Sequence, residues 1–221
     1  EMLKGKFKPG LQTIAPDALL LYAPDSMALD VSAQKLLDLL HQNAYLTASI
    51  DSLVFQNDST ASARLFLGPA MYWLQLRPAS AADARWLGAA GFREKIFTGR
   101  ALHYEQLLRQ EQQILRQAEN NGYPFAAVQL DSLELDTAGG ASAVLRVDPG
   151  PFFTFMLPKV NGNVRLPARY LPQYLGLRAG VPYSHARVLR IRERINSLLF
   201  VETLANPTVT FAGSEARVNL F

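Results

Sequence analysis

One order of helices and strands recurs along this chain of 221 residues, and the recurrence limits what the chain can fold into. Leu36–Phe55 and Ile114–Leu135 each read as an amphipathic helix, an Asn-small-Tyr stop and an alternating strand containing Asp-Ser-Leu. Each then reaches a Gly-Pro pair, and these pairs, Gly68-Pro69 and Gly150-Pro151, are 150 − 68 = 82 residues apart. A third helix and two strands follow, so the sequence predicts three units.

The second unit predicts the element order β-α-α-β-β. A strand over 71–78 precedes a short helix near 81–90 and a long helix, which ends at Asn121-Gly122. The long helix has an apolar stripe formed by Leu107, Leu108, Ile114, Leu115 and Ala118. Residues 125–136 alternate with period two, and a glycine turn joins them to another strand. The third unit repeats this order, with a strand over 152–162, a short helix and a helix over 185–200 for which Ser184 is the predicted N-cap.

The expected fold class is therefore α+β, with tandem β-α-α-β-β units, each a three-stranded mixed sheet covered on one face by two helices. The predicted boundaries are 1–69, 70–150 and 151–221. The first unit has three prolines near its start, so we expect its opening half to be shortened or divergent. The abrupt beginning at Glu1 and the strand that stops at Phe221 read as a piece of a longer protein, with more chain expected after it.

The composition argues against several kinds of function. There is no cysteine, which excludes disulfides and thiolate metal sites. A net charge of +3 is too small to indicate nucleic-acid binding, and no apolar run approaches the roughly 18–20 residues that cross a bilayer. The histidines His41, His103 and His185 fall in separate units without metal-binding spacing. We therefore expect no metal, no cofactor and no nucleic-acid partner.

The glycines between Pro158 and Ser184 lead into helices, an arrangement that can hold phosphate groups. A P-loop requires Lys-Ser or Lys-Thr after its second glycine, whereas Gly180 is followed by Val-Pro. These glycines are interpreted as turns and helix ends. No Gly-x-Ser-x-Gly elbow occurs, and Asp131 with Glu134 falls on a strand hairpin, where a solvated face is the simpler interpretation. The sequence therefore predicts no enzyme.

The pattern as a whole resembles tandem POTRA domains, the periplasmic repeats that precede the β-barrel of BamA/TamA-type outer-membrane assembly proteins. The marks are Val160–Ser184, with its glycines, followed by a helix that runs to Phe200, and the helix end Asn120–Val128, "NNGYPFAAV". The resemblance covers Tyr72–Phe221 and extends more weakly to Leu29–Pro69. It lies in the order of elements, the glycine positions and the repeat, because no single motif is unique to this family.

Two surfaces are candidates for binding. The first is the open edge of each hairpin's first strand, where an extended peptide can add by main-chain hydrogen bonds. The alternative is that these edges are blunted and their apolar residues face their own helices. The second is a basic stripe on the last helix, for anionic lipid or an acidic partner; the alternative is an ordinary solvated face. The edge residues are Ala126, Ala127, Val128, Gln129, Leu130, Thr208, Val209, Thr210 and Phe211, and the stripe is Arg187, Arg190 and Arg194.

The resemblance implies a non-enzymatic polypeptide-binding region in the periplasm of a Gram-negative bacterium. Its implied partners are unfolded outer-membrane protein clients, accessory periplasmic or lipoprotein factors, and a C-terminal β-barrel in the full-length protein. Two alternatives stay open: the POTRA region of a secretion transporter or lipase-fused barrel, and a periplasmic scaffold without a barrel. The near absence of linkers also predicts limited hinge motion between the second and third units.

Overall fold

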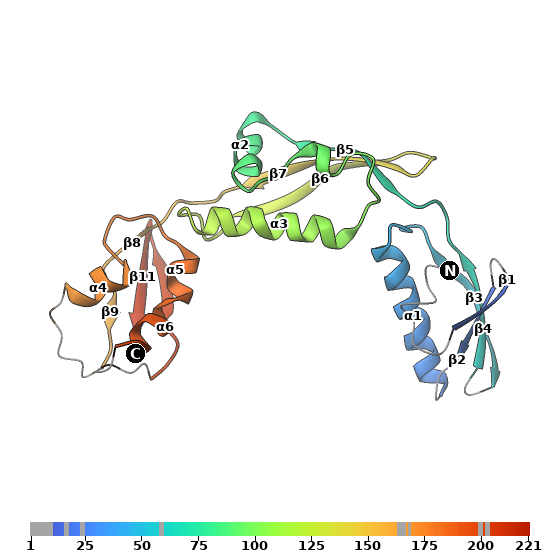
Figure 1. The fold of residues 1–221 in the computed structure, drawn as a ribbon, viewed down its shortest axis with the longest axis horizontal. Helices are drawn as coiled ribbons and strands as arrows, with labels where there is room; N and C mark the ends of the chain where they lie inside the picture. Colours follow the sequence, from blue (N-terminus) through green and yellow to red (C-terminus); the bar gives the residue numbers. More distant parts are fainter. Residues whose placement is uncertain are drawn as a thin grey trace. The chain divides into compact units, whose positions relative to one another are not determined.

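The structure is a computed structural model of the chain. It describes residues 11–15, 18–22, 25–57, 60–162, 167, 169–198, 201 and 204–221. Residues 1–10 of the predicted first unit lie outside the described residues, as do residues 163–166, 168 and 199–200 of the motifs quoted above. Figure 1 shows the order of helices and strands along the chain.

By the density of internal contacts the chain divides into two compact units. One unit contains residues 1–77, 93–108 and 132–144, and the other contains residues 78–92, 109–131 and 145–221. The middle β-α-α-β-β stretch thus contributes to both. The division into three units at 69/70 and 150/151 stays a prediction; for reference, residues 11–69, 70–150 and 151–221 are called the first, second and third segments.

The first segment pairs one helix with a four-stranded sheet of order β1-β2-β4-β3. Helix α1 begins after Asp25, whose carboxylate accepts the Ala28 N–H at 2.8 Å. The buried apolar residues of α1, such as Leu36, pack with those of β4, such as Ala63. The elements are β1 (Leu11–Ala15), β2 (Ala18–Tyr22), α1 (Ser26–Gln42), β3 (Ser49–Asn57) and β4 (Thr60–Phe66).

The prediction of two helices and three strands per unit is not met in this segment. Only 49 − 22 − 1 = 26 residues separate β2 from β3, and α1 uses 17 of them, which leaves no room for a second helix. The extra strand comes from the preceding residues, which form the β1–β2 pair. At 17 residues α1 is the longest described helix, and none of the described helices is long and apolar enough to cross a membrane.

The second segment has the predicted β-α-α-β-β order, with a short 3₁₀ turn between its helices. Its sheet has the order β5-β7-β6, so the last strand lies in the middle. Of the five residues of the predicted stripe on the long helix, Leu107, Ile114 and Ala118 are buried, and Leu108 and Leu115 are half-buried. The elements are β5 (Tyr72–Pro78), α2 (Ala81–Ala89), η1 (Glu94–Ile96), α3 (Tyr104–Glu119), β6 (Ala127–Leu135) and β7 (Gly140–Asp148).

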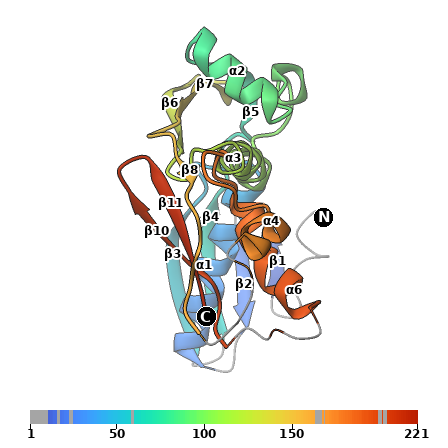
Figure 2. The same cartoon turned by 90° about the vertical axis from the view of Figure 1, so that its left-hand side faces the viewer.

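The third segment repeats this arrangement in a mixed sheet of order β10-β11-β8. Strands β8 and β9 run parallel to β11, and β10 runs antiparallel to it. Figure 2 shows α4 and α6 on one side of this sheet. The elements are β8 (Thr154–Phe155), β9 (Lys159–Val160), α4 (Tyr170–Leu175), α5 (His185–Leu189), α6 (Ile191–Asn196), β10 (Thr208–Ala212) and β11 (Glu215–Leu220).

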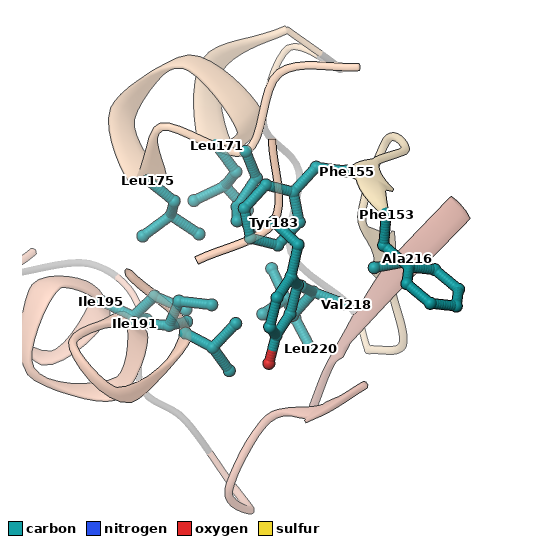
Figure 3. Packing of buried hydrophobic residues seen from close by; sticks show 12 residues of the cluster. Phe153, Phe155, Leu171, Leu175, Tyr183, Ile191, Ile195, Ala216, Val218 and Leu220 are labelled. Atoms are coloured by element: carbon teal, nitrogen blue, oxygen red, sulfur yellow. The ribbon is translucent and has the colours of Figure 1, made fainter. Parts of the chain in front are cut away.

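The core of the third segment forms between these helices and β11. Ala216, Val218 and Leu220 alternate along β11 with their side chains buried. Figure 3 shows the apolar side chains of α4 and α6 meeting those of β11, with Tyr183 among them. The predicted α+β class is therefore confirmed, and the three-stranded, helix-covered unit describes the second and third segments.

Two local predictions in the third segment are wrong. The expected strand over 152–162 is two short strands, since it contains Pro158, which has no backbone N–H to continue a ladder. The expected single helix over 185–200 is divided into α5 and α6 at Arg190. The backbone there has a ψ of −5°, far from the helical value near −42°.

Candidate functional site

The two predicted peptide-binding strands lie at the ends of their sheets. β6 is the terminal strand next to β7, and β10 is the terminal strand next to β11. Half-buried and exposed residues alternate along 127–130 and along β10, Leu133 and Leu135 farther along β6 are exposed, and Ala126 directly precedes β6. The half-buried residues are Val128, Leu130, Val209 and Phe211, and the exposed ones are Ala127, Gln129, Thr208 and Thr210.

β10 is the more regular of these two edges. Its pairing with β11 runs from Thr208 to Ala212 without a register shift, and the strand carries no charged residue. A two-residue turn closes the hairpin between Ala212 and Glu215, so hydrogen-bonded pairs alternate outward from that pair. This alternation directs the N–H and C=O groups of Val209 and Phe211 away from β11, toward the open edge.

β6 is interrupted partway along its length. Ser132 has a φ of 52°, a left-handed conformation that is rare outside glycine. Its neighbour Asp131 forms a 3.0 Å ion pair with Arg146. A local irregularity and charged side chains are two ways in which proteins blunt an open strand edge. Only residues 127–131 of β6 precede the irregularity.

Aromatic rings border the start of β6 and the end of β10. Phe125, Phe153 and Phe211 meet edge to face, with ring centroids 4.9–5.5 Å apart. Phe153 is buried, whereas the side chain of Phe125 is 54% exposed. An apolar surface therefore lies beside the outward-facing backbone of Phe211.

The predicted arginine stripe is used partly within the fold. The Arg187 guanidinium donates to the carbonyl of Gly176 at 3.2 Å and lies 5.8 Å from the ring centroid of Phe155. Arg194 donates to the carbonyl of Tyr174 at 3.3 Å. Both therefore serve the C-terminal end of α4, whose last carbonyls lack helical partners. The Arg190 side chain is exposed at the break between α5 and α6.

The glycine-containing loop before α5 has a counterpart in the second segment. Gly180, with a φ of 80°, donates its N–H to the carbonyl of Phe155 at 2.9 Å. Gly99, with a φ of 72°, donates to the carbonyl of Trp73 at 2.7 Å. The same backbone pairing thus ties the interhelix loop to the first strand in both segments. The N–H of Gly180 is occupied within the fold, as expected of a turn.

The three histidines lie far apart along the chain, and each has a local neighbour. A ring nitrogen of His41 donates to the carbonyl of Ala48 at 3.0 Å, and His103 donates to the carbonyl of Gln42 at 3.2 Å. His185 Nδ1 lies 3.2 Å from the Tyr183 hydroxyl. Within the described part of the chain no three His, Asp or Glu side chains gather as metal ligands would.

The pKa of the buried carboxyl of Asp83 reflects a structural role. Burial alone would raise that pKa, but hydrogen bonds from the Ser80 hydroxyl and the Val147 N–H, with the charge of Arg146, hold it below its usual value. Asp83 thereby joins the start of α2 to β7. Burial raises the pKa of Glu111 on α3.

One structurally important side chain was missed by sequence reasoning. Ser184 occupies the N-cap position of α5, but its side chain does not cap the helix. The side-chain amide oxygen of Asn120, Oδ1, accepts instead, from the Ser184 hydroxyl at 3.0 Å and from the Ala186 N–H at 2.8 Å. Asn120 follows α3 and was interpreted only as part of a helix stop.

Comparison with known proteins places this architecture among solved structures. No family model and no curated protein matches the sequence. POTRA domains 3–5 of BamA from Haemophilus influenzae align with a TM-score of 0.53 and 17% identity, over 86% of this chain and 78% of that one. BamA from Haemophilus ducreyi lacking POTRA domains 1–3 aligns with a TM-score of 0.50 and 15% identity, over 69% of this chain and 28% of that one. The chain therefore has the fold of BamA POTRA domains, which confirms the fold that the sequence resemblance predicted.

Proposed function

We propose that this chain is a periplasmic, non-enzymatic polypeptide-binding region of an outer-membrane β-barrel protein, composed of three POTRA-like units and active in assembling outer-membrane proteins. The likeness to BamA POTRA domains supports the class of protein. The single observation that supports binding is the open edge of β10, which is uncharged and regular along its length. An extended client strand adds there by main-chain hydrogen bonds, and β6 offers a shorter second edge.

The geometry of β10 defines what such a client looks like. Val209 and Phe211 offer two N–H donors and two C=O acceptors, which an extended segment of any sequence can pair. The ring of Phe125 beside Phe211 favours an apolar side chain on the helix-facing side of the client. A strand with apolar residues at every second position meets both requirements. Strands of outer-membrane barrels have that pattern.

The direct test is a titration of the isotope-labelled 221-residue chain with a synthetic amphipathic strand peptide. We expect the largest backbone amide shifts at Val209 and Phe211, with smaller shifts on β6 before Ser132. A control peptide of the same composition, with its alternation scrambled, produces weaker shifts. Absence of shifts at the β10 amides with every amphipathic strand tested would rule out binding at this edge.

Two variants separate the parts of the interaction. Val209→Pro removes one outward N–H while leaving the hydrogen bonds of Thr208 and Thr210 to β11 in place. Phe125→Ser removes the exposed ring and leaves the backbone edge unchanged. We expect the first variant to abolish binding and the second to weaken it by about tenfold, the equivalent of about 1.4 kcal/mol. Unchanged binding in both variants places the peptide elsewhere.

A further inference from the structure

The charge of the chain is divided unevenly along its length. Residues 151–221 contain nine Lys and Arg against three Asp and Glu, a net charge of 9 − 3 = +6. The whole chain carries +3, so residues 1–150 carry 3 − 6 = −3. Eight of the nine basic residues in 151–221 are arginines. A basic segment attached to an acidic one indicates a surface that meets an anionic partner.

Several of these arginines gather at the C-terminal end of α4. Arg187 and Arg194 reach that end through their hydrogen bonds to the carbonyls of Gly176 and Tyr174. Arg190 lies between them in the chain, and Arg178 follows the end of α4 by three residues. Arg178, Arg190 and Arg194 are exposed. Each guanidinium has five donors, so one bond to a carbonyl leaves Arg187 and Arg194 able to donate further.

The described carboxylates of the third segment form no ion pair with these arginines. The structure describes two carboxylates in the third segment, Glu193 on α6 and Glu215 on β11. Neither forms an ion pair with a described arginine. The exposed side chains of Arg178, Arg190 and Arg194 therefore have no ion pair with a carboxylate that the structure describes in this segment.

Amphipathic and apolar side chains accompany the arginines. Tyr170 and Tyr174 stack in parallel with centroids 6.0 Å apart, and the Tyr174 hydroxyl donates to the carbonyl of Arg194. Tyr170 is 39% exposed, and Leu189, next to Arg190 in the chain, is 68% exposed. Tyrosine and arginine with an exposed leucine suit a lipid headgroup layer, where rings and alkyl groups enter the interface and guanidinium groups bind phosphate.

We propose that the third segment binds the phosphate-bearing surface of an anionic lipid bilayer through this cluster, defined as Arg178, Arg187, Arg190 and Arg194 with Tyr170. Arg178 and Arg190 supply the charge that is free of helix-end contacts. Arg187, which is half-buried, and Arg194 fix the cluster to α4, and the exposed Arg194 also donates to headgroup phosphates. This surface is separate from the β10 edge, so it does not depend on polypeptide binding.

The test is flotation of the 221-residue chain with vesicles of phosphatidylcholine alone and of phosphatidylcholine mixed with phosphatidylglycerol. We expect binding to the anionic vesicles, with an affinity that falls as salt is raised. R178Q/R190Q lowers the partition coefficient about thirtyfold, at about fivefold for each arginine. The matched control, R85Q/R116Q, removes two exposed arginines from the acidic part of the chain and leaves binding nearly unchanged.

Three results would overturn the proposal: no binding to anionic vesicles, equal losses in the two double variants, or binding to a polyglutamate peptide without binding to vesicles. The last result assigns the cluster to an acidic protein. Arg178 and Arg190 make no helix-end bond, so we expect R178Q/R190Q to keep the fold. An unchanged circular dichroism spectrum checks this. Titration of R178Q/R190Q with the amphipathic strand peptide still shifts the β10 amides, so failure of the lipid proposal is distinguishable from failure of the proposed function.

Discussion

The first and second joints, where one segment passes into the next, share one backbone pattern. In the first joint the Met71 N–H donates to the carbonyl of Ala44, and in the second the Phe153 N–H donates to that of Gly122, both at 2.7 Å. The carbonyls of Met71 and Phe153 each accept an N–H at 2.9 Å from the loop before the following helix. The matched positions are Ala44 with Gly122, Met71 with Phe153, Leu102 with Tyr183, and His103 with Ser184.

The joints differ in the side chains around this pattern. The second joint has Phe153 against Phe125 and Phe211, and Tyr183 against Phe211, whereas the matched residues of the first joint are Met71 and Leu102. At the second joint the Asn120 side chain accepts two hydrogen bonds from the third segment. At the first joint the carbonyl of Gln42 accepts one, from the His103 ring. The backbone hydrogen bonds are common to both joints, and the side-chain contacts determine how stable each joint is.

Phe153→Ala should have the largest effect of the changes at either joint. Loss of a buried phenyl ring costs about 3–5 kcal/mol, because a cavity remains where the ring packed. Its edge-to-face partners add about 0.5–1.5 kcal/mol each. Hydrogen exchange of the β11 amides measures the loss. Met71→Ala is the matched change at the first joint, and an equally large loss of protection on β4 would mean that the aromatic contacts do not distinguish the joints.

Gly122→Ala should follow, at about 2 kcal/mol or more. Gly122 has a φ of 99°, which costs an L-residue about 1–2 kcal/mol, and an added Cβ collides with the ring of Phe152. Ala44 occupies the matched position at the first joint with a φ of 75°. Ala44→Gly relieves that strain but loses a buried methyl group, so we expect a change within about 1 kcal/mol. Urea unfolding compares the two variants, and a tolerated Gly122→Ala would refute the close packing at Phe152.

Asn120→Ala should cost about 1–2 kcal/mol, because it leaves the Ala186 N–H and the Ser184 hydroxyl without their acceptor. Asn120→Asp keeps the acceptor oxygen and should retain most of the stability. Gln42→Ala is the matched control, since the acceptor at the first joint is a backbone carbonyl that the substitution preserves. Equal effects of Asn120→Ala and Gln42→Ala on hydrogen exchange of the β11 amides would show that the Asn120 side chain contributes nothing to stability.

The repeat itself could be predicted from the sequence because its signals are local. The stripe through Leu107 and Ile114, the stop at Asn121-Gly122 and the last strand, β11, each lie within one element, and each is present. The POTRA fold followed from their order. The first segment has a single helix because few residues separate β2 from β3. The sequence did not predict this, because β1 and β2 lie in the irregular opening of the chain, where no strand was predicted.

The candidate sites were less accessible to sequence reasoning, because they depend on residues far apart in the chain. Ser184 has the residue type of an N-cap, but the acceptor is Asn120, 64 residues earlier. The spacing of Arg187, Arg190 and Arg194 predicted a continuous stripe on one helix. In the structure Arg187 and Arg194 donate to carbonyls at the end of α4, and the helix breaks at Arg190. The irregularity at Ser132 likewise reflects the geometry of the folded β6 edge, since serine carries no strong local signal for a positive φ.

Tyr183→Phe should have the smallest effect on stability of these changes at neutral pH. At alkaline pH it distinguishes the second joint from the first. Burial, with a contribution from Glu119 at the end of α3, raises the pKa of Tyr183 to about 12. The fold therefore favours the neutral phenol. The stabilisation is complete below the unfolded pKa near 10 and is lost as the pH rises from there to about 12. The matched Leu102 does not titrate, so only the second joint has this dependence.

Tyrosinate absorbance tests this directly, since the chain has eight tyrosines and only the transition near pH 12 should vanish in Tyr183→Phe. Urea unfolding at pH 7 and pH 11 provides the energetic readout. The unmodified chain should lose more stability between the two values than Tyr183→Phe does, because at pH 11 the Tyr183 phenol ionises in the unfolded chain but stays mostly protonated in the fold. An identical loss in both proteins would assign alkaline unfolding to groups outside the joint, and the second joint would then resemble the first in its response to pH.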